Sequence, residues 1–130
     1  MGKLTLALLL TVNLLSAKQC TDLRFALAGN PAPLTFTSKD IIYVTDGDTD
    51  STVWVTYLSL KPNPKFNAAY TRVLYETRLI NNIPMLRTMA IAGYKCNGEL
   101  TLSIMNTGNW QYVTPSTTGS EIYQYVLDRQ

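Results

Sequence analysis

Three aspartates at alternate positions, Asp46, Asp48 and Asp50, form the most concentrated group of charges in the chain. Carboxylates at this spacing can converge on a hard cation, and extracellular calcium keeps such a site filled even when its affinity is weak. An EF-hand would also need glycine at the sixth position of the loop and glutamate at the twelfth, where this chain has Ser51 and Tyr57. The sequence therefore favours a polar hairpin turn here, with a calcium site as the alternative.

Other residue types that support catalysis are absent or scattered. The chain contains no histidine, which removes the usual general base near neutral pH and the commonest transition-metal ligand. It has no glycine-rich phosphate loop, no dinucleotide fingerprint and no Cys-x-x-Cys redox motif. Glu76, Glu99 and Glu121 are the only glutamates, and no two of them lie close together for paired-carboxylate chemistry. We expect a protein that is not an enzyme and has no cofactor.

Cys20 and Cys96 are the only two cysteines. In an oxidising compartment an even number of cysteines favours a disulfide, whereas in the cytosol the two would remain separate thiols. A bridge would tie the N-terminal arm to a distant part of the chain. By the chain-entropy argument, closing so long a loop stabilises the fold by roughly 4 kcal/mol.

The N-terminus indicates which compartment applies. Lys3 precedes an apolar run from Leu4 to Leu15, and Ser16 and Ala17 follow it. This order is typical of a cleaved secretory leader, and the run is too short to cross a hydrocarbon core of about 30 Å. We therefore predict a signal peptide over residues 1–17, a secreted mature protein and no stable membrane anchor. The alternative is a retained helix that packs into the core.

Residues 18–130 are enough for one domain with its own core, and we expect a single β-rich domain there. Without Lys3, ten cations remain against nine anions, and the cations are scattered singly. Nucleic-acid binding needs clustered lysine and arginine, so it is not expected. A surface with so little charge favours association with a protein partner or with further copies of the chain, and a homo-oligomer is compatible with it.

Hydrophobic periodicity predicts mainly strands. Residues 52–60 are rich in β-branched and aromatic types, and residues 40–45 precede them across the aspartate turn, as in a hairpin. Residues 100–105 alternate apolar and polar side chains. We also expect strands over 109–114 and 121–128, the last because its apolar residues alternate. Several short strands separated by turn residues predict an all-β fold, a small antiparallel sandwich or barrel.

The segment over residues 68–80 fits two structures. Its apolar and charged residues alternate as in a half-buried strand, but Asn67 could cap a helix in which Arg72 and Glu76 form an i,i+4 pair. Tyrosine, threonine and valine dominate its composition, which favours the strand. A helix at 68–80 is the alternative.

Aromatic residues are distributed over every predicted strand. Tyrosine and tryptophan combine apolar area with a polar tip and suit partner surfaces, although core packing also uses them. The candidate binding residues are Trp54, Trp110, Tyr112, Tyr123 and Tyr125.

Short segments of the chain resemble the lipocalins, a family of secreted carriers of apolar molecules. The resemblance lies in Cys20 of the N-terminal arm, in the sequence Ala-Gly-Tyr-Lys-Cys over 92–96, and in Tyr-Val-Leu-Asp-Arg over 125–129. The Gly-x-Trp of the first lipocalin strand is missing. The resemblance implies a barrel whose interior holds a small apolar ligand.

These observations predict a secreted, non-enzymatic binding protein that recognises a macromolecular partner through an aromatic-rich β surface. The first alternative is a lipocalin-like extracellular carrier, which requires an enclosed cavity of about 300 Å³ or more. The second is a viral or other structural subunit that self-assembles and keeps residues 1–17 as packing surface.

Overall fold

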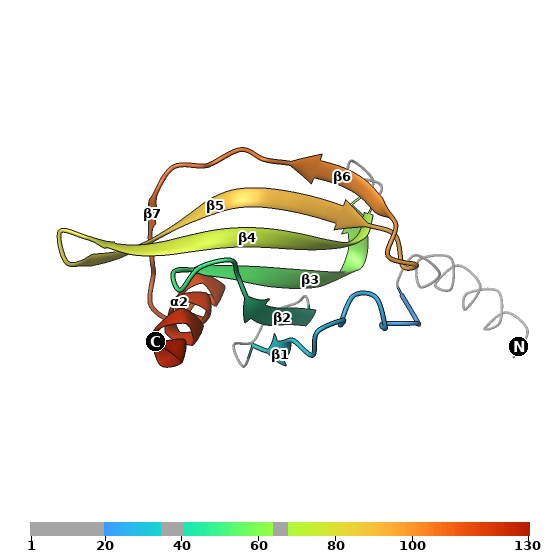
Figure 1. Ribbon diagram of the computed structural model, residues 1–130, viewed down its shortest axis with the longest axis horizontal. Helices are drawn as coiled ribbons and strands as arrows, with labels where there is room; N and C mark the ends of the chain where they lie inside the picture. The colour runs from blue at the N-terminus through green and yellow to red at the C-terminus, as the bar shows by residue number, and fades with distance from the viewer. Residues whose placement is uncertain (1–19, 35–40, 64–67) are drawn as a thin grey trace, which may run out of the picture.

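The computed structural model describes residues 20–34, 41–63 and 68–130, which form one open antiparallel sheet and a C-terminal helix (Figure 1). The sheet has seven strands in the order β1-β2-β3-β4-β5-β6, and β7 also pairs with β5. Its elements are β1 (Ala32–Pro33), β2 (Ile41–Asp46), β3 (Thr52–Asn63), β4 (Ala68–Ile80), β5 (Ile83–Tyr94), β6 (Leu100–Ile104), β7 (Gln111–Tyr112) and α2 (Thr118–Arg129).

The predicted leader at residues 1–17 lies outside the described residues. Within the described residues, no helix has the length and apolar character needed to cross a membrane.

Two hairpins organise the centre of the sheet. The predicted hairpin around the aspartates is confirmed, because β2 pairs with β3 from Ile41 opposite Leu58 to Asp46 opposite Val53. The hairpin of β4 and β5 closes with a two-residue turn in which Asn81 and Asn82 have φ angles of 53° and 64°. Both central positions of a tight hairpin turn of this kind need positive φ, and asparagine tolerates it better than most residues.

The segment over 68–80 is a strand, as the sequence favoured, and the helix alternative is wrong. β4 lies in the middle of the sheet, where β3 and β5 pair with its two edges. Val73 and Leu74 are neighbours on opposite faces and both are buried. Consecutive apolar residues of this kind also fit the apolar stripe of a helix. The sequence pattern therefore fitted both a strand and a helix over 68–80.

The predicted strand over 121–128 is wrong, because this segment forms α2. The helix begins with a reciprocal cap in which the Ser120 amide donates to Thr117 Oγ1 at 3.2 Å and the Thr117 amide donates to Ser120 Oγ at 3.1 Å. Ile122 and Val126 are spaced for one helix face, and both are buried against the sheet. The alternation that suggested a strand also contains this i,i+4 spacing.

The expected sandwich or barrel is also wrong, since the described strands form a single open sheet with a helix on one face. Ile122 and Val126 of α2 pack with Val44, Val53 and Val55 in one core cluster. The helix covers this face over β2 and β3, where a second sheet would otherwise pack. The predicted strand over 109–114 shortens to Gln111–Tyr112.

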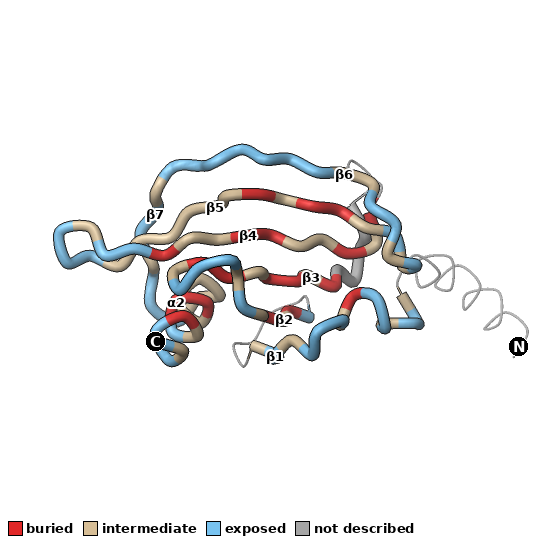
Figure 2. The backbone as a smooth tube through the Cα atoms, in the orientation of Figure 1, coloured by how far each residue is buried: buried red, intermediate tan, exposed pale blue. Residues whose placement is uncertain are grey.

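The opposite face of the sheet is covered at one end by the N-terminal arm, residues 20–34. Ala26 of the arm packs with Leu58 and Tyr70, and Leu23 and Tyr94 lie against them. Leu58 and Val55 are three positions apart in β3, which places them on opposite faces. Figure 2 shows the buried stretches in the middle of β3, β4 and β5 and in α2.

Replacing Ile122 with alanine tests whether α2 holds this face. We expect Ile122→Ala to lower the free energy of unfolding by about 2–4 kcal/mol, because it leaves a cavity at a fully buried site. Leu127→Ala, on the exposed side of the same helix, is the matched control and should cost less than about 1 kcal/mol. Urea denaturation measures both, and equal losses would contradict the seating of the helix.

Candidate functional site

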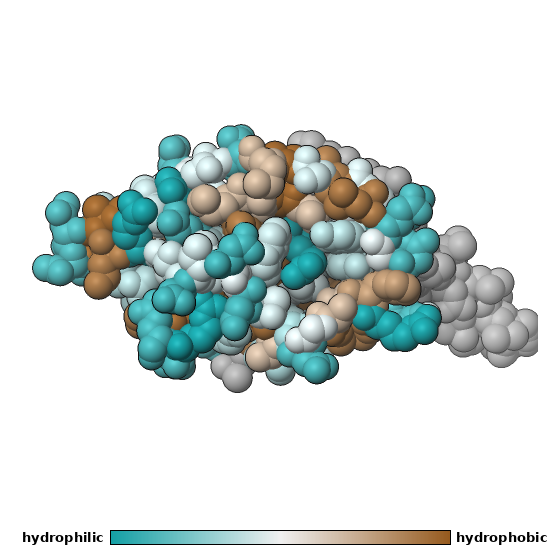
Figure 3. All heavy atoms as spheres, viewed as in Figure 1, coloured by the Kyte–Doolittle hydropathy of each residue, from teal (hydrophilic) through white to brown (hydrophobic). Residues whose placement is uncertain are grey.

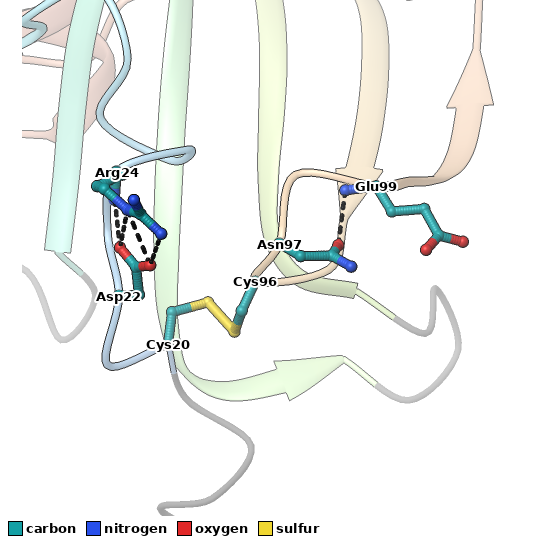
Figure 4. Close-up of a disulfide and its surroundings, with 6 residues drawn as sticks. All are labelled: Cys20, Asp22, Arg24, Cys96, Asn97 and Glu99. Carbon is teal, nitrogen blue, oxygen red and sulfur yellow. Dashed lines mark hydrogen bonds and ion pairs between the residues drawn. A yellow bond between two sulfur atoms is a disulfide. The ribbon is translucent and has the colours of Figure 1, made fainter.

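The predicted disulfide between Cys20 and Cys96 is confirmed, with the two Cα atoms 5.3 Å apart (Figure 4). It joins the start of the arm to the turn between β5 and β6. Next to it, Phe25 of the arm lies over Gly98, where a Cβ would meet Phe25 Cδ1 at 2.8 Å. Gly98 also has a φ of +88°, so the turn needs glycine for two reasons. The arm is thus held to this turn by a covalent bond and by packing.

The three aspartates lie in and beside the β2–β3 turn, as a polar hairpin turn predicts. Asp46 Oδ1 accepts hydrogen bonds from Arg129 Nη1 at 2.8 Å and from Tyr125 Oη at 2.9 Å. Asp50 contributes its carbonyl oxygen, which accepts from Arg129 Nη2 at 2.9 Å. Among residues 20–34, 41–63 and 68–130, no three acidic, cysteine or histidine side chains come together as metal ligands. Asp46 thus pairs with the Arg129 guanidinium and holds the C-terminal end of α2 to the hairpin.

This contact affects the pKa values of both partners of Arg129. The hydrogen bond from Arg129, followed by that from Tyr125, lowers the pKa of the Asp46 carboxyl below its usual value. Burial, followed by the hydrogen bond to Asp46, raises the pKa of the Tyr125 phenol. Tyr125, predicted as a binding residue, therefore has a structural contact here.

The five candidate binding residues do not form one surface. Tyr123 is buried in the core and Tyr125 contacts Asp46. Trp54 stacks with Arg72, whose Cζ lies 5.1 Å from the ring centroid. Tyr112 is exposed on β7. Sequence periodicity placed Tyr123 and Tyr125 on one face of a strand, but in a helix residues two apart point to different sides.

Trp110 contacts two arginines. The Cζ atoms of Arg87 and Arg78 lie 4.3 Å and 5.0 Å from its ring centroid. Glu76 fixes both cations, with Glu76 Oε1 2.7 Å from Arg87 Nη2 and Glu76 Oε2 3.5 Å from Arg78 Nη2. The ring and its cations are attracted electrostatically. Trp110 is therefore a fixed point of the chain at the start of β7.

The two edges of the sheet differ in their protection. β1 is only two residues long, and Pro31 and Pro33 in and beside it cannot donate backbone hydrogen bonds. β6, at the other edge, has no such device, and the chain from Leu100 to Ser120 contains no charged residue at all. Charged side chains are what edge strands commonly use to prevent pairing with other chains.

The β6 edge also exposes apolar side chains. Leu100 is 53% exposed, Ile104 37% and Met105 80%. Every residue of the run over 103–109 is exposed, as the pale blue connection from β6 towards β7 shows (Figure 2). Figure 3 shows hydrophobic surface where β6 runs. We call residues 102–109 the open edge; the sequence predicted a strand over 100–105, and the lack of charge from Leu100 to Ser120 can be read from the sequence.

Two further surface features lie outside this edge. The tip of the β4–β5 hairpin exposes Leu79 and Ile83 and projects beyond the rest of the sheet (Figure 1). A pocket of about 80 Å³ lies between β5 and the connection to β7, and Arg87 and Asn109 are among its lining residues. Ligand pockets for drug-sized molecules span about 300–1,000 Å³, so this pocket is too small for the apolar ligand of a carrier.

No protein-family model matches the chain, and no curated protein or solved structure is significantly similar to it.

Substituting Asp46 tests the contact between α2 and the hairpin. We expect Asp46→Asn to lower Tm at pH 7 by about 1–3 °C, since this ion pair is exposed to solvent. The pKa of Asp46 is lower in the folded state, so its stabilisation is complete above the unfolded pKa and is lost as pH falls through the folded value. The difference in Tm should therefore shrink below about pH 4.

Asp48→Asn is the control, because Asp48 has no ion pair with the described residues. Thermal unfolding followed by circular dichroism from pH 7 to pH 2 measures both variants. A Tm difference for Asp46→Asn that stays constant with pH would show that the carboxylate charge is not what fastens the helix.

Proposed function

We propose that this chain is an exported, non-enzymatic interaction protein that binds an extended segment of a protein partner along its open edge. The observation that carries the proposal is the unprotected, uncharged and apolar β6 edge, with Ile104 and Met105 exposed. An edge strand with these properties is a template for pairing with another strand. The proposal moves the binding surface from an aromatic sheet face to an edge.

The proposed recognition has two components. Backbone groups of β6 supply hydrogen bonds that are independent of sequence, and alternating side chains supply selectivity. Leu102 and Ile104 are two positions apart and so point to the same side of the sheet. Trp110 and Tyr112 lie further along the same side of β5, because β7 pairs with β5 beyond the end of β6. Tyr112 is exposed and adds an aromatic side chain to this side, whereas the Trp110 ring contacts Arg78 and Arg87.

An export route supports this function. The disulfide needs an oxidising compartment to persist, and the leader pattern of residues 1–17 provides the route to one. In the proposed function, the protein acts outside the cell by binding a partner and not by catalysis.

Intact mass spectrometry tests export and oxidation together. When the full chain is expressed in cells with a secretory pathway, we expect the protein in the medium to lack residues 1–17. Its mass should also be lower than that of the reduced protein by two hydrogens, because the disulfide has formed. Treatment with a reductant should restore the two hydrogens, which serves as the internal control. Recovery of the full chain only from the cytosol, with both thiols free, would contradict the proposal.

A peptide selection tests the edge. From a library of extended peptides of about ten residues, we expect uncharged sequences with alternating β-branched residues to bind the disulfide-bonded protein. Ile104→Lys should weaken the selected peptides at least about tenfold, because it places a solvated charge at the pairing strand. Fluorescence polarisation with labelled peptides measures the affinity.

Leu127→Lys, an exposed leucine on α2, is the matched control and should bind the peptides like the unsubstituted protein. Equal binding to Ile104→Lys would show that the peptides do not use the edge. Failure to select any peptide would also contradict the proposed function.

A further inference from the structure

We propose that the open edge pairs with the same edge of a second copy of this chain. The two β6 strands would run antiparallel about a two-fold axis at Ser103 and join two sheets into one. This inference rests on the proposed function, because it uses the same edge and names its partner.

A row of apolar residues crosses the sheet and ends at this edge. Val55 pairs with Val73, Val73 with Ile91, and Ile91 with Ile104, so the row runs from β3 to β6 on one face. The exposed fraction rises along it, from 0% at Val55 and 8% at Val73 to 37% at Ile104. The row is buried at Val55 and Val73, partly buried at Ile91 and exposed at Ile104, where the sheet ends.

A second copy would continue this row. With the axis at Ser103, Ile104 lies directly opposite Leu102 of the second copy, and Leu102 lies opposite Ile104 of that copy. Directly opposed apolar side chains on one face are the pairs that stabilise antiparallel strands. The register therefore forms two equivalent apolar pairs, which is the self-complementarity that a two-fold interface requires.

The charges and the other edge favour a second copy over a different partner. No charged residue lies between Leu100 and Ser120, so two copies meet without repulsion, and the edge offers no charge for an oppositely charged partner. The β1 edge is blocked by Pro31 and Pro33. Pairing therefore stops at two copies, because the described strands of each copy offer one open edge.

The interface is short, and the dimer should be correspondingly weak. β6 has five residues, a length of roughly 17 Å, which is at the small end of specific interfaces. We expect a dissociation constant on the order of 10–100 µM and a reversible equilibrium.

Sedimentation equilibrium of the disulfide-bonded protein, up to about 500 µM, tests the proposal. We expect a monomer–dimer equilibrium for the unsubstituted protein and an at least tenfold weaker one for Ile104→Lys. Leu79→Lys, at the exposed tip of the β4–β5 hairpin, is the matched control and should dimerise normally. Circular dichroism and Tm confirm that each variant is folded.

Cysteine cross-linking tests the register. Directly opposed Cα atoms in an antiparallel pair are about 4.5–5.5 Å apart, which suits a disulfide, so Ser103→Cys should form a covalent dimer under mild oxidation. Thr107→Cys, also exposed, would lie roughly 26 Å from its equivalent and should not. Peptide mapping identifies the bond and confirms that Cys20–Cys96 is intact.

Three results would overturn the dimer. They are a protein that remains monomeric at about 500 µM, a dimer that Ile104→Lys leaves unchanged, and cross-linking of Thr107→Cys that equals that of Ser103→Cys. If the protein is monomeric but selected peptides still bind in an Ile104-dependent way, the dimer fails and the proposed function stands. If Ile104→Lys changes neither measurement, both fail.

Discussion

An open antiparallel sheet presents two faces and two edges to water, and apolar surface on each of them must be covered or protected. In this chain α2 covers one face through Ile122 and Val126, and the arm that begins at Cys20 covers part of the other. Prolines in and beside β1 protect one edge. Among the described strands, the β6 edge has neither such prolines nor charged residues, and this contrast supports the binding proposed along it.

The disulfide holds the arm in place. The arm contributes little regular structure of its own, since its only strand is Ala32–Pro33, and its packing residues are Ala26 and a few partly buried neighbours. Ordering a backbone costs about 1–2 kcal/mol per residue, which such packing offsets poorly. A bridge spanning 76 residues stabilises by roughly 4 kcal/mol in the chain-entropy model, a large part of a typical total of 5–15 kcal/mol. The disulfide is thus linked to the cover that the arm gives to this sheet face.

Strand pairs that are local in sequence could be predicted, but the way the layers close could not. The β2–β3 hairpin, the strand over 68–80 and the disulfide follow from β-branched composition, turn residues and cysteine number. The C-terminal segment was misjudged because Ile122 and Val126 satisfy both a two-residue and a four-residue period, while the cap at Thr117 and Ser120 was overlooked. With that segment taken as a strand, the sequence predicted a second sheet to cover the apolar face. The sequence analysis did not predict the open edge as a candidate site, because it selected binding residues by aromatic type. The informative property of residues 100–120 is instead their lack of charge.

The open edge is also held at both ends, which bears on how it can bind. At one end Ile104 pairs with Ile91 of β5, and at the other Trp110 contacts Arg78 and Arg87. Between them the Gly108 amide donates to the Thr88 carbonyl at 2.8 Å, which ties the connection to β5 a third time. A segment anchored in this way loses less conformational entropy on binding than a free loop, so more of the contact energy remains as affinity. In the proposed recognition, the contacts of Trp110 with Arg78 and Arg87 would contribute by holding one end of the edge in place.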